Sequence, residues 1–227
     1  MVQDRLSALS RKIRDVCLSC GRDPAEVTLV GVTKTADVPR ISEALTAGLS
    51  DIAENRVQVA REKFPRLNLR GVRTHLIGHL QTNKVKEAVG IFDLIQSVDS
   101  IKLADEISKR AGTIGKVQDI LLQVDIAKEE QKFGLPEEEA ERFVSHVAGL
   151  QNVRLLGLMT MAPLTGDREL IRSVFRQARK MFDAFKSGEH EDRIEMRHLS
   201  MGMSGDFEIA ISEGANMVRV GSAIFDS

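Results

Sequence analysis

The sequence contains no tyrosine and no tryptophan, only two cysteines, and no long apolar run. The two cysteines, Cys17 and Cys20, are too few for a disulfide framework and are typical of a reducing compartment. No apolar stretch approaches the roughly 18 residues that suggest a membrane-spanning helix. The first residues also lack the basic-then-apolar order of a signal peptide. We therefore expect a cytoplasmic protein.

The net charge of the sequence is close to zero as well. The 227 residues include 32 Lys+Arg and 33 Asp+Glu, which gives a formal net charge of −1. This balance offers no electrostatic basis for binding nucleic acid. A hydrophobic content of 42% with 29% charged residues is typical of a folded globular protein. No linker, low-complexity tract or charge block divides the chain, so we expect residues 1–227 to form a single domain.

Eight short apolar runs of strand length alternate with segments of helical spacing. An extra helix at 3–20 precedes the first run, and another is predicted to open at Pro136 with an acidic first turn. Such alternation predicts parallel strands joined by helical crossovers. The runs are 27–33, 51–53, 74–78, 94–98, 119–125, 154–160, 198–201 and 217–221, and further helices are predicted at 38–47, 101–107, 167–187 and 205–213.

Two architectures suit this alternation: an open, doubly wound sheet and a closed (β/α)8 barrel of the TIM type. The count of eight in a chain of this length favours the barrel, with the extra N-terminal helix outside it. In such barrels the chemistry lies at the carboxyl ends of the strands. Polar residues at those ends are therefore the candidates for a functional site.

Lys34 ends the first apolar run. Partial desolvation there favours the neutral amine that a Schiff base with a carbonyl compound requires. The alternative is a solvated lysine at the start of a loop. The segment is not a Walker-type phosphate loop, because it lacks the glycine immediately before the lysine.

Two glycine-containing turns follow the last two apolar runs, at 198–206 and 217–222. In a barrel they follow strands seven and eight, which is the usual position of a phosphate site. Backbone N–H groups at a helix start bind anions well. We predict phosphate binding here, with two ordinary tight turns as the alternative.

Other polar residues follow the second and third runs. Asn55 either lines the pocket or caps the next helix. His75 and His79 are spaced like a zinc pair on a helix, but on a strand four residues span roughly 13 Å. Cys17 and Cys20 lack a second ligand pair, so they are expected to be free thiols. We predict no metal site.

Taken together, these segments resemble the pyridoxal phosphate homeostasis protein family. The resemblance implies a barrel like the N-terminal domain of alanine racemase, with pyridoxal 5′-phosphate bound as a Schiff base to Lys34. The matching segments are 30–35, 54–58, 75–84, 132–134, 157–163, 199–204 and 217–221.

The resemblance also implies contacts for the other parts of the cofactor. Ser200, Gly221 and Ser222 align with phosphate-binding positions, and Arg219 aligns with the arginine that faces the pyridine nitrogen. Asn55 aligns with a pocket residue, while Met201 and His79 match more loosely. The full set of cofactor-binding candidates is Lys34, Asn55, His79, Ser200, Met201, Arg219, Gly221 and Ser222.

The residues bear on catalysis too. An arginine beside the ring nitrogen disfavours protonation of the ring, which makes the cofactor a poorer electron sink. The related racemases use a lysine and a tyrosine as two bases, but this chain has no tyrosine, and we expect no counterpart of their C-terminal β-domain. We expect a monomer that holds and exchanges the cofactor, with apo-enzymes as transient partners and little turnover of amino acids. The alternatives are a weak amino-acid racemase and a Schiff-base aldolase acting on a sugar phosphate.

Overall fold

The structure, a computed structural model, describes residues 1–127, 133–188 and 193–226. Lys132, the first residue of the matching segment 132–134, lies outside the described residues.

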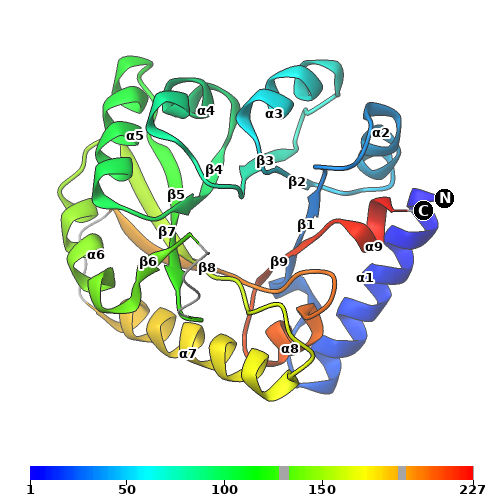
Figure 1. Ribbon diagram of the computed structural model, residues 1–227. Helices are drawn as coiled ribbons and strands as arrows, with labels where there is room; N and C mark the ends of the chain where they lie inside the picture. Colours follow the sequence, from blue (N-terminus) through cyan, green and yellow to red (C-terminus); the bar gives the residue numbers. More distant parts are fainter. Residues whose placement is uncertain (128–132, 189–192, 227) are drawn as a thin grey trace.

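A closed ring of eight parallel strands forms the centre of the described molecule (Figure 1). Neighbours in the ring are parallel, and the pairings of β1 with β9 and of β4 with β5 complete the closure. The predicted (β/α)8 barrel is confirmed. Its strands are β1 (Thr28–Val32), β2 (Asp51–Glu54), β3 (Arg73–Leu76), β4 (Leu94–Val98), β5 (Gln118–Asp125), β7 (Val153–Met159), β8 (Ile194–Ser200) and β9 (Met217–Val220).

Helices cover the outside of the barrel (Figure 1). The predicted extra helix, α1 (Val2–Ser19), packs against α2, α8 and α9. The other α-helices are α2 (Val38–Thr46), α3 (Val57–Lys63), α4 (Val85–Ile91), α5 (Ile101–Thr113), α6 (Ala140–Ala148), α7 (Arg168–Ser187), α8 (Phe207–Ser212) and α9 (Ser222–Phe225). Short 3₁₀ turns lie at Pro24–Glu26, Phe64–Arg66, Thr82–Lys84 and Glu137–Glu139.

Polar side chains start several of these helices. Ser100 Oγ accepts a hydrogen bond from the backbone N–H of Leu103 at the start of α5. Asp167 Oδ1 accepts from two backbone N–H groups at the start of α7. These caps satisfy N–H groups that have no partner within the helix.

The segment after Gly134 differs from its prediction. Leu135–Pro136 form a short strand, β6, beside the end of β5, and α6 begins only at Ala140. Pro136 has an extended ψ of 140°, which suits a strand end. The acidic residues Glu137–Glu139 form a 3₁₀ turn rather than the first turn of an α-helix.

The interior of the barrel is partly apolar and partly polar. Val30, Val32, Leu121 and Met217 belong to a buried apolar cluster contributed by alternate strand residues. Polar side chains of the strands are buried with equally little exposure, among them His75, Gln96 and Arg219. A second, larger apolar cluster packs the helices. Within the described ranges, no helix is both long enough and apolar enough to cross a membrane.

Candidate functional site

A cavity of about 590 Å³ opens at the carboxyl ends of the barrel strands. Residues far apart in the sequence converge on it, as a barrel requires. Five of the predicted site residues line it: Lys34, Asn55, Arg219, Gly221 and Ser222. The rest of the wall includes Val32, Thr35, Ile77, Met159, Met161, Met203, Ser204, Gly205 and Asp226.

Lys34 follows β1 and is itself exposed, so its amine is accessible. The residue before it is fixed: Thr33 Oγ1 donates to Glu54 Oε1 at 2.8 Å. Lys63 Nζ donates both to the Thr33 carbonyl, at 2.8 Å, and to Glu54 Oε1, at 2.9 Å. Thr33 and Glu54 are fully buried. A buried ion pair between the barrel and α3 thus holds the backbone that carries Lys34.

Arg219 is a buried cation in the cavity wall. It is only 3% exposed, and its guanidinium donates to Ser200 Oγ at 2.7 Å and to the Thr160 carbonyl at 2.9 Å. Burial lowers the pKa of Arg219 to about 10, against the opposing effect of Asp206. The side chain therefore stays positively charged at neutral pH.

Asn55 is held in place by a close approach of two backbones. A Cβ on Gly78 would lie 2.1 Å from the carbonyl oxygen of Asn55, so only glycine fits at that position. The Gly78 carbonyl in turn accepts a hydrogen bond from Ser97 Oγ at 2.7 Å. The backbone after β3, at Gly78, therefore packs directly against the backbone of Asn55 and fixes its position.

The loop between β8 and α8 contributes a serine that the sequence interpretation did not select. Ser204 lines the cavity, and Ser222 lines it from the loop after β9. Asp206 Oδ1 accepts from the backbone N–H of Met203 and so closes the loop. Two hydroxyl groups thus lie in the wall formed by the loops after the last two strands, where the phosphate site was predicted.

Three predicted site residues lie elsewhere in the described structure. Ser200 is fully buried beside Arg219. Met201 is fully buried in the larger apolar cluster. The His79 ring stacks on Phe133 with centroids 3.9 Å apart, and its Nδ1 lies 3.2 Å from Asp99 Oδ2. Their contact with a cofactor stays a prediction.

In the part of the chain that the structure describes, no three His, Cys, Asp or Glu side chains are grouped to hold a metal ion. Cys17 and Cys20 are free thiols. Burial raises the pKa of the Cys17 thiol, with Arg22 acting in opposition. Neither cysteine belongs to the cavity wall described above.

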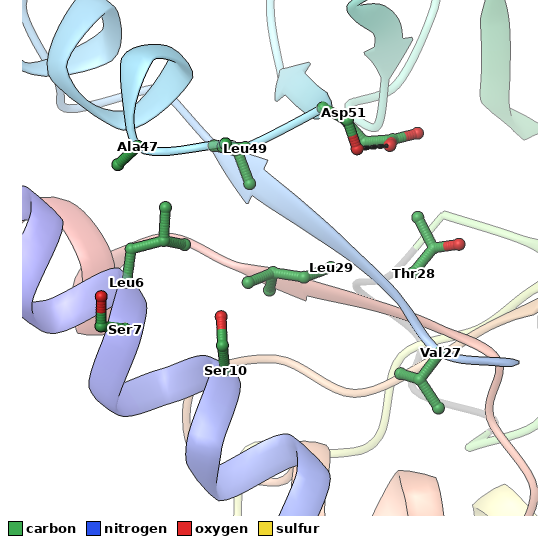
Figure 2. Close-up of a pocket in the computed structure, with 11 residues that line it drawn as sticks. Leu6, Ser7, Ser10, Val27, Thr28, Leu29, Ala47, Leu49 and Asp51 are labelled. Atoms are coloured by element: carbon green, nitrogen blue, oxygen red, sulfur yellow. Dashed lines mark hydrogen bonds between the residues drawn. The ribbon is translucent and has the colours of Figure 1, made fainter. Parts of the chain in front are cut away.

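A second cavity, of about 560 Å³, lies near the amino end of β1, opposite to Lys34. Figure 2 shows Leu6, Ser7 and Ser10 of α1 on one side of it and Asp51 at the far side. The two carboxylate oxygens of Asp51 are already engaged, by His75 Nε2 at 3.0 Å and by Ser50 Oγ at 2.8 Å.

The fold and the site define a class: a (β/α)8 barrel with an accessible lysine at the end of its first strand and a buried arginine on its last. The family model of the alanine racemase N-terminal domain matches residues 5–227. A pyridoxal phosphate homeostasis protein of Aquifex aeolicus (strain VF5) is 40% identical over 222 residues, which are 98% of this chain and 96% of that protein. The chain belongs to the family of pyridoxal phosphate homeostasis proteins.

Solved structures agree with this assignment. PipY of Synechococcus elongatus PCC7942, in a structure with PLP bound, is 34% identical, covers 99% of this chain and 100% of its own, and has a TM-score of 0.86. An alanine racemase of Clostridium difficile 630 in complex with cycloserine has a TM-score of 0.74 at 16% identity, covering 99% of this chain and 60% of its own. That second likeness shows the fold alone.

Proposed function

We propose that this protein binds pyridoxal 5′-phosphate through Lys34 and acts in vitamin B6 homeostasis, holding and exchanging the cofactor. The names of its relatives and the PLP-bound PipY structure support this proposal. The observation that carries it is that the accessible amine of Lys34 and the buried guanidinium of Arg219 line one cavity.

The residues in the cavity wall fit the groups of this cofactor. Lys34 supplies a primary amine for the aldehyde, and Ser204 and Ser222 supply hydroxyl groups for the phosphate. The wall is also open where a phosphate needs room, because a Cβ on Gly205 would meet no atom within 4 Å. The bound cofactor supplies an electrophilic carbon and a conjugated ring that accepts electrons.

Arg219 favours storage over catalysis. Because it remains charged beside the place proposed for the pyridine nitrogen, it opposes a proton on that nitrogen by like-charge repulsion. The ring then withdraws electrons less strongly. The sequence also has no tyrosine, so a lysine and tyrosine pair of bases cannot form within the chain.

On this proposal the protein works in the cytoplasm as a monomer and passes the cofactor to apo-enzymes in transient contacts. The near-zero net charge argues for a small-molecule ligand rather than nucleic acid.

The test is to load the protein with pyridoxal 5′-phosphate, reduce it with borohydride and map the labelled peptide. The label is expected on Lys34. The bound cofactor is expected to absorb violet light, and the Lys34→Ala variant should lose this absorption band. Lys102→Ala, which removes an exposed lysine on α5, serves as the control. A label on another lysine, or none, would overturn the proposal. Transfer of the cofactor to an apo-transaminase then tests exchange.

A further inference from the structure

A chain of four hydrogen bonds crosses the interior of the barrel from the cavity wall to the opposite end. All five of its side chains are buried, none with more than 6% exposure. The links are Arg219 Nη1 to Ser200 Oγ at 2.7 Å, Ser200 Oγ to Gln96 Oε1 at 2.6 Å, Gln96 Nε2 to His75 Nδ1 at 2.9 Å, and His75 Nε2 to Asp51 Oδ1 at 3.0 Å.

The two ends of the chain, Arg219 and Asp51, fix which group donates and which accepts in each of its hydrogen bonds. A guanidinium can only donate and a carboxylate can only accept. Ser200 accepts from Arg219, so its own O–H donates to Gln96 Oε1. The amide N–H of Gln96 then donates to His75 Nδ1, which leaves the imidazole proton on Nε2, facing Asp51. With the Gln96 amide reversed, the Ser200 hydroxyl would face two donors and have no acceptor in the chain.

The electrostatics agree with this assignment. Burial lowers the pKa of His75 and keeps the ring neutral, although the hydrogen bond to Asp51 acts in the opposite direction. Burial also acts to raise the pKa of Asp51, but hydrogen bonds from His75 and Ser50 outweigh it and hold that pKa below its ordinary value. An ionised acceptor therefore terminates a chain whose other end is a cation.

Such a chain places the stability of the barrel at risk, since each buried polar group left without a partner would destabilise the protein by about 1–3 kcal/mol. Apolar side chains would fill the same space without that risk. What the chain accomplishes is local: it turns a lone pair of Ser200 toward Arg219, on the neighbouring strand. The Thr160 carbonyl fixes the other terminal nitrogen of the guanidinium.

We infer that Gln96 is a positioning residue for Arg219. Supported by His75 and Asp51, it orients the Ser200 hydroxyl so that the guanidinium is held at the place proposed for the ring nitrogen of a bound cofactor. This inference rests on the proposed function for its consequence, because Arg219 acts on a bound cofactor. The hydrogen-bond chain itself can be tested without any cofactor.

The first experiment compares Gln96→Met with Gln118→Met. Methionine is close to glutamine in size and removes the two links that Gln96 makes, to Ser200 and to His75. Gln118 is equally buried, at the start of β5, and its amide donates to the Asp93 and Asp119 carbonyls, outside the chain. Gln96→Met should release the cofactor about threefold to tenfold faster and shift its absorption band, whereas Gln118→Met should do neither.

Two further variants make the result specific. Ser200→Ala removes the acceptor of Arg219 with little change in volume and should shift the band in the same direction as Gln96→Met. In an Arg219→Met background, Gln96→Met should have no additional effect, because residues of one network are not additive. A full additional effect, or equal behaviour of Gln96→Met and Gln118→Met, would overturn the inference.

The second experiment uses the apo-protein. Nitrogen-15 NMR of the wild-type His75 ring should show a protonated Nε2 and a bare Nδ1. A proton on Nδ1 would refute the chain whether or not the cofactor binds. Conversely, wild-type protein that fails to load at Lys34 while showing the expected tautomer would refute the proposed function and leave the chain standing.

Discussion

Arg219 Nη1 donates a hydrogen bond to Ser200 Oγ at 2.7 Å, between the adjacent strands β9 and β8. Both side chains point into the barrel and both are buried. The Ser200 hydroxyl is engaged by Arg219 and Gln96, and its contact with the phosphate stays a prediction. Ser204, in the loop that follows, lines the cavity. The two serines therefore have separable effects.

Ser204→Asp should weaken cofactor binding at least about tenfold, or about 1.4 kcal/mol, because it places a carboxylate beside the phosphate. Equilibrium dialysis with pyridoxal 5′-phosphate measures the change. Ser10→Asp, in the cavity at the opposite end (Figure 2), is the control and should bind normally. Undiminished binding by Ser204→Asp would assign the phosphate to another group.

Arg219→Glu should raise the pKa of the cofactor's ring nitrogen, because it replaces a fixed positive charge by a negative one. A protonated ring is the better electron sink, so amino acids should exchange their α-proton with deuterated solvent faster than on the wild type. Absorption spectra and proton NMR measure the two effects. Arg70→Glu, at an exposed loop position, should change neither, and an unchanged spectrum in Arg219→Glu would remove Arg219 from the ring.

The sequence predicts the barrel and the position of Lys34 because both depend on local signals. Apolar β-branched runs mark the strands, and the carboxyl ends of parallel strands meet at one end of the barrel. That Ser200 is buried while Ser204 lines the cavity depends instead on partners from distant parts of the chain. The Ser200 hydroxyl is engaged by Arg219 on β9 and by Gln96 on β4.

The sequence pattern does not indicate a role for Gln96 for a related reason. It lies inside the apolar run 94–98, where a single amide does not disturb the pattern. Its importance comes from partners on β3 and β8, which no local spacing reveals. The short strand β6 is likewise hidden, since its two residues gain their conformation from pairing with Val124 and Asp125.

Lys63→Met should destabilise the protein by about 3 kcal/mol, because it leaves the buried carboxylate of Glu54 without its cation. Glu54 Oε2 already has no hydrogen-bond partner among the described residues. Urea denaturation measures the loss. The double variant Glu54→Gln with Lys63→Met should recover much of the stability.

The control for this pair is Lys84→Met. Lys84 contacts Glu87 at 3.5 Å in a half-exposed position, where an ion pair contributes less than about 1 kcal/mol. A loss in Lys63→Met no larger than in Lys84→Met would show that the buried pair does not hold the Lys34 backbone.

Stability should fall as the pH drops from about 6.5 toward 4. Burial lowers the pKa of His198 to about 4, helped by the positive charge of Arg73. Between that value and the ordinary pKa of about 6.5, the unfolded chain binds a proton that the native protein refuses. The lost stability for His198 is about 3 kcal/mol, and His75 acts in the same direction.

Denaturation midpoints measured across this pH range test the effect. His198→Gln should flatten the slope, whereas His146→Gln, at an exposed position on α6, should not. An equal slope in the wild type, His198→Gln and His146→Gln would assign the acid sensitivity to other groups.

Gly78→Ala should weaken cofactor binding without touching the cofactor. The added Cβ would lie 2.1 Å from the Asn55 carbonyl oxygen and 2.9 Å from its Cα, and neither backbone atom can rotate away. Asn55 must move out of the cavity wall, at a stability loss of about 1–3 kcal/mol. Gly90→Ala, whose Cβ would meet nothing within 4 Å on α4, should instead stabilise the protein by roughly 0.5–1 kcal/mol. Equal cofactor affinity in the two variants would show that Asn55 does not contribute to binding.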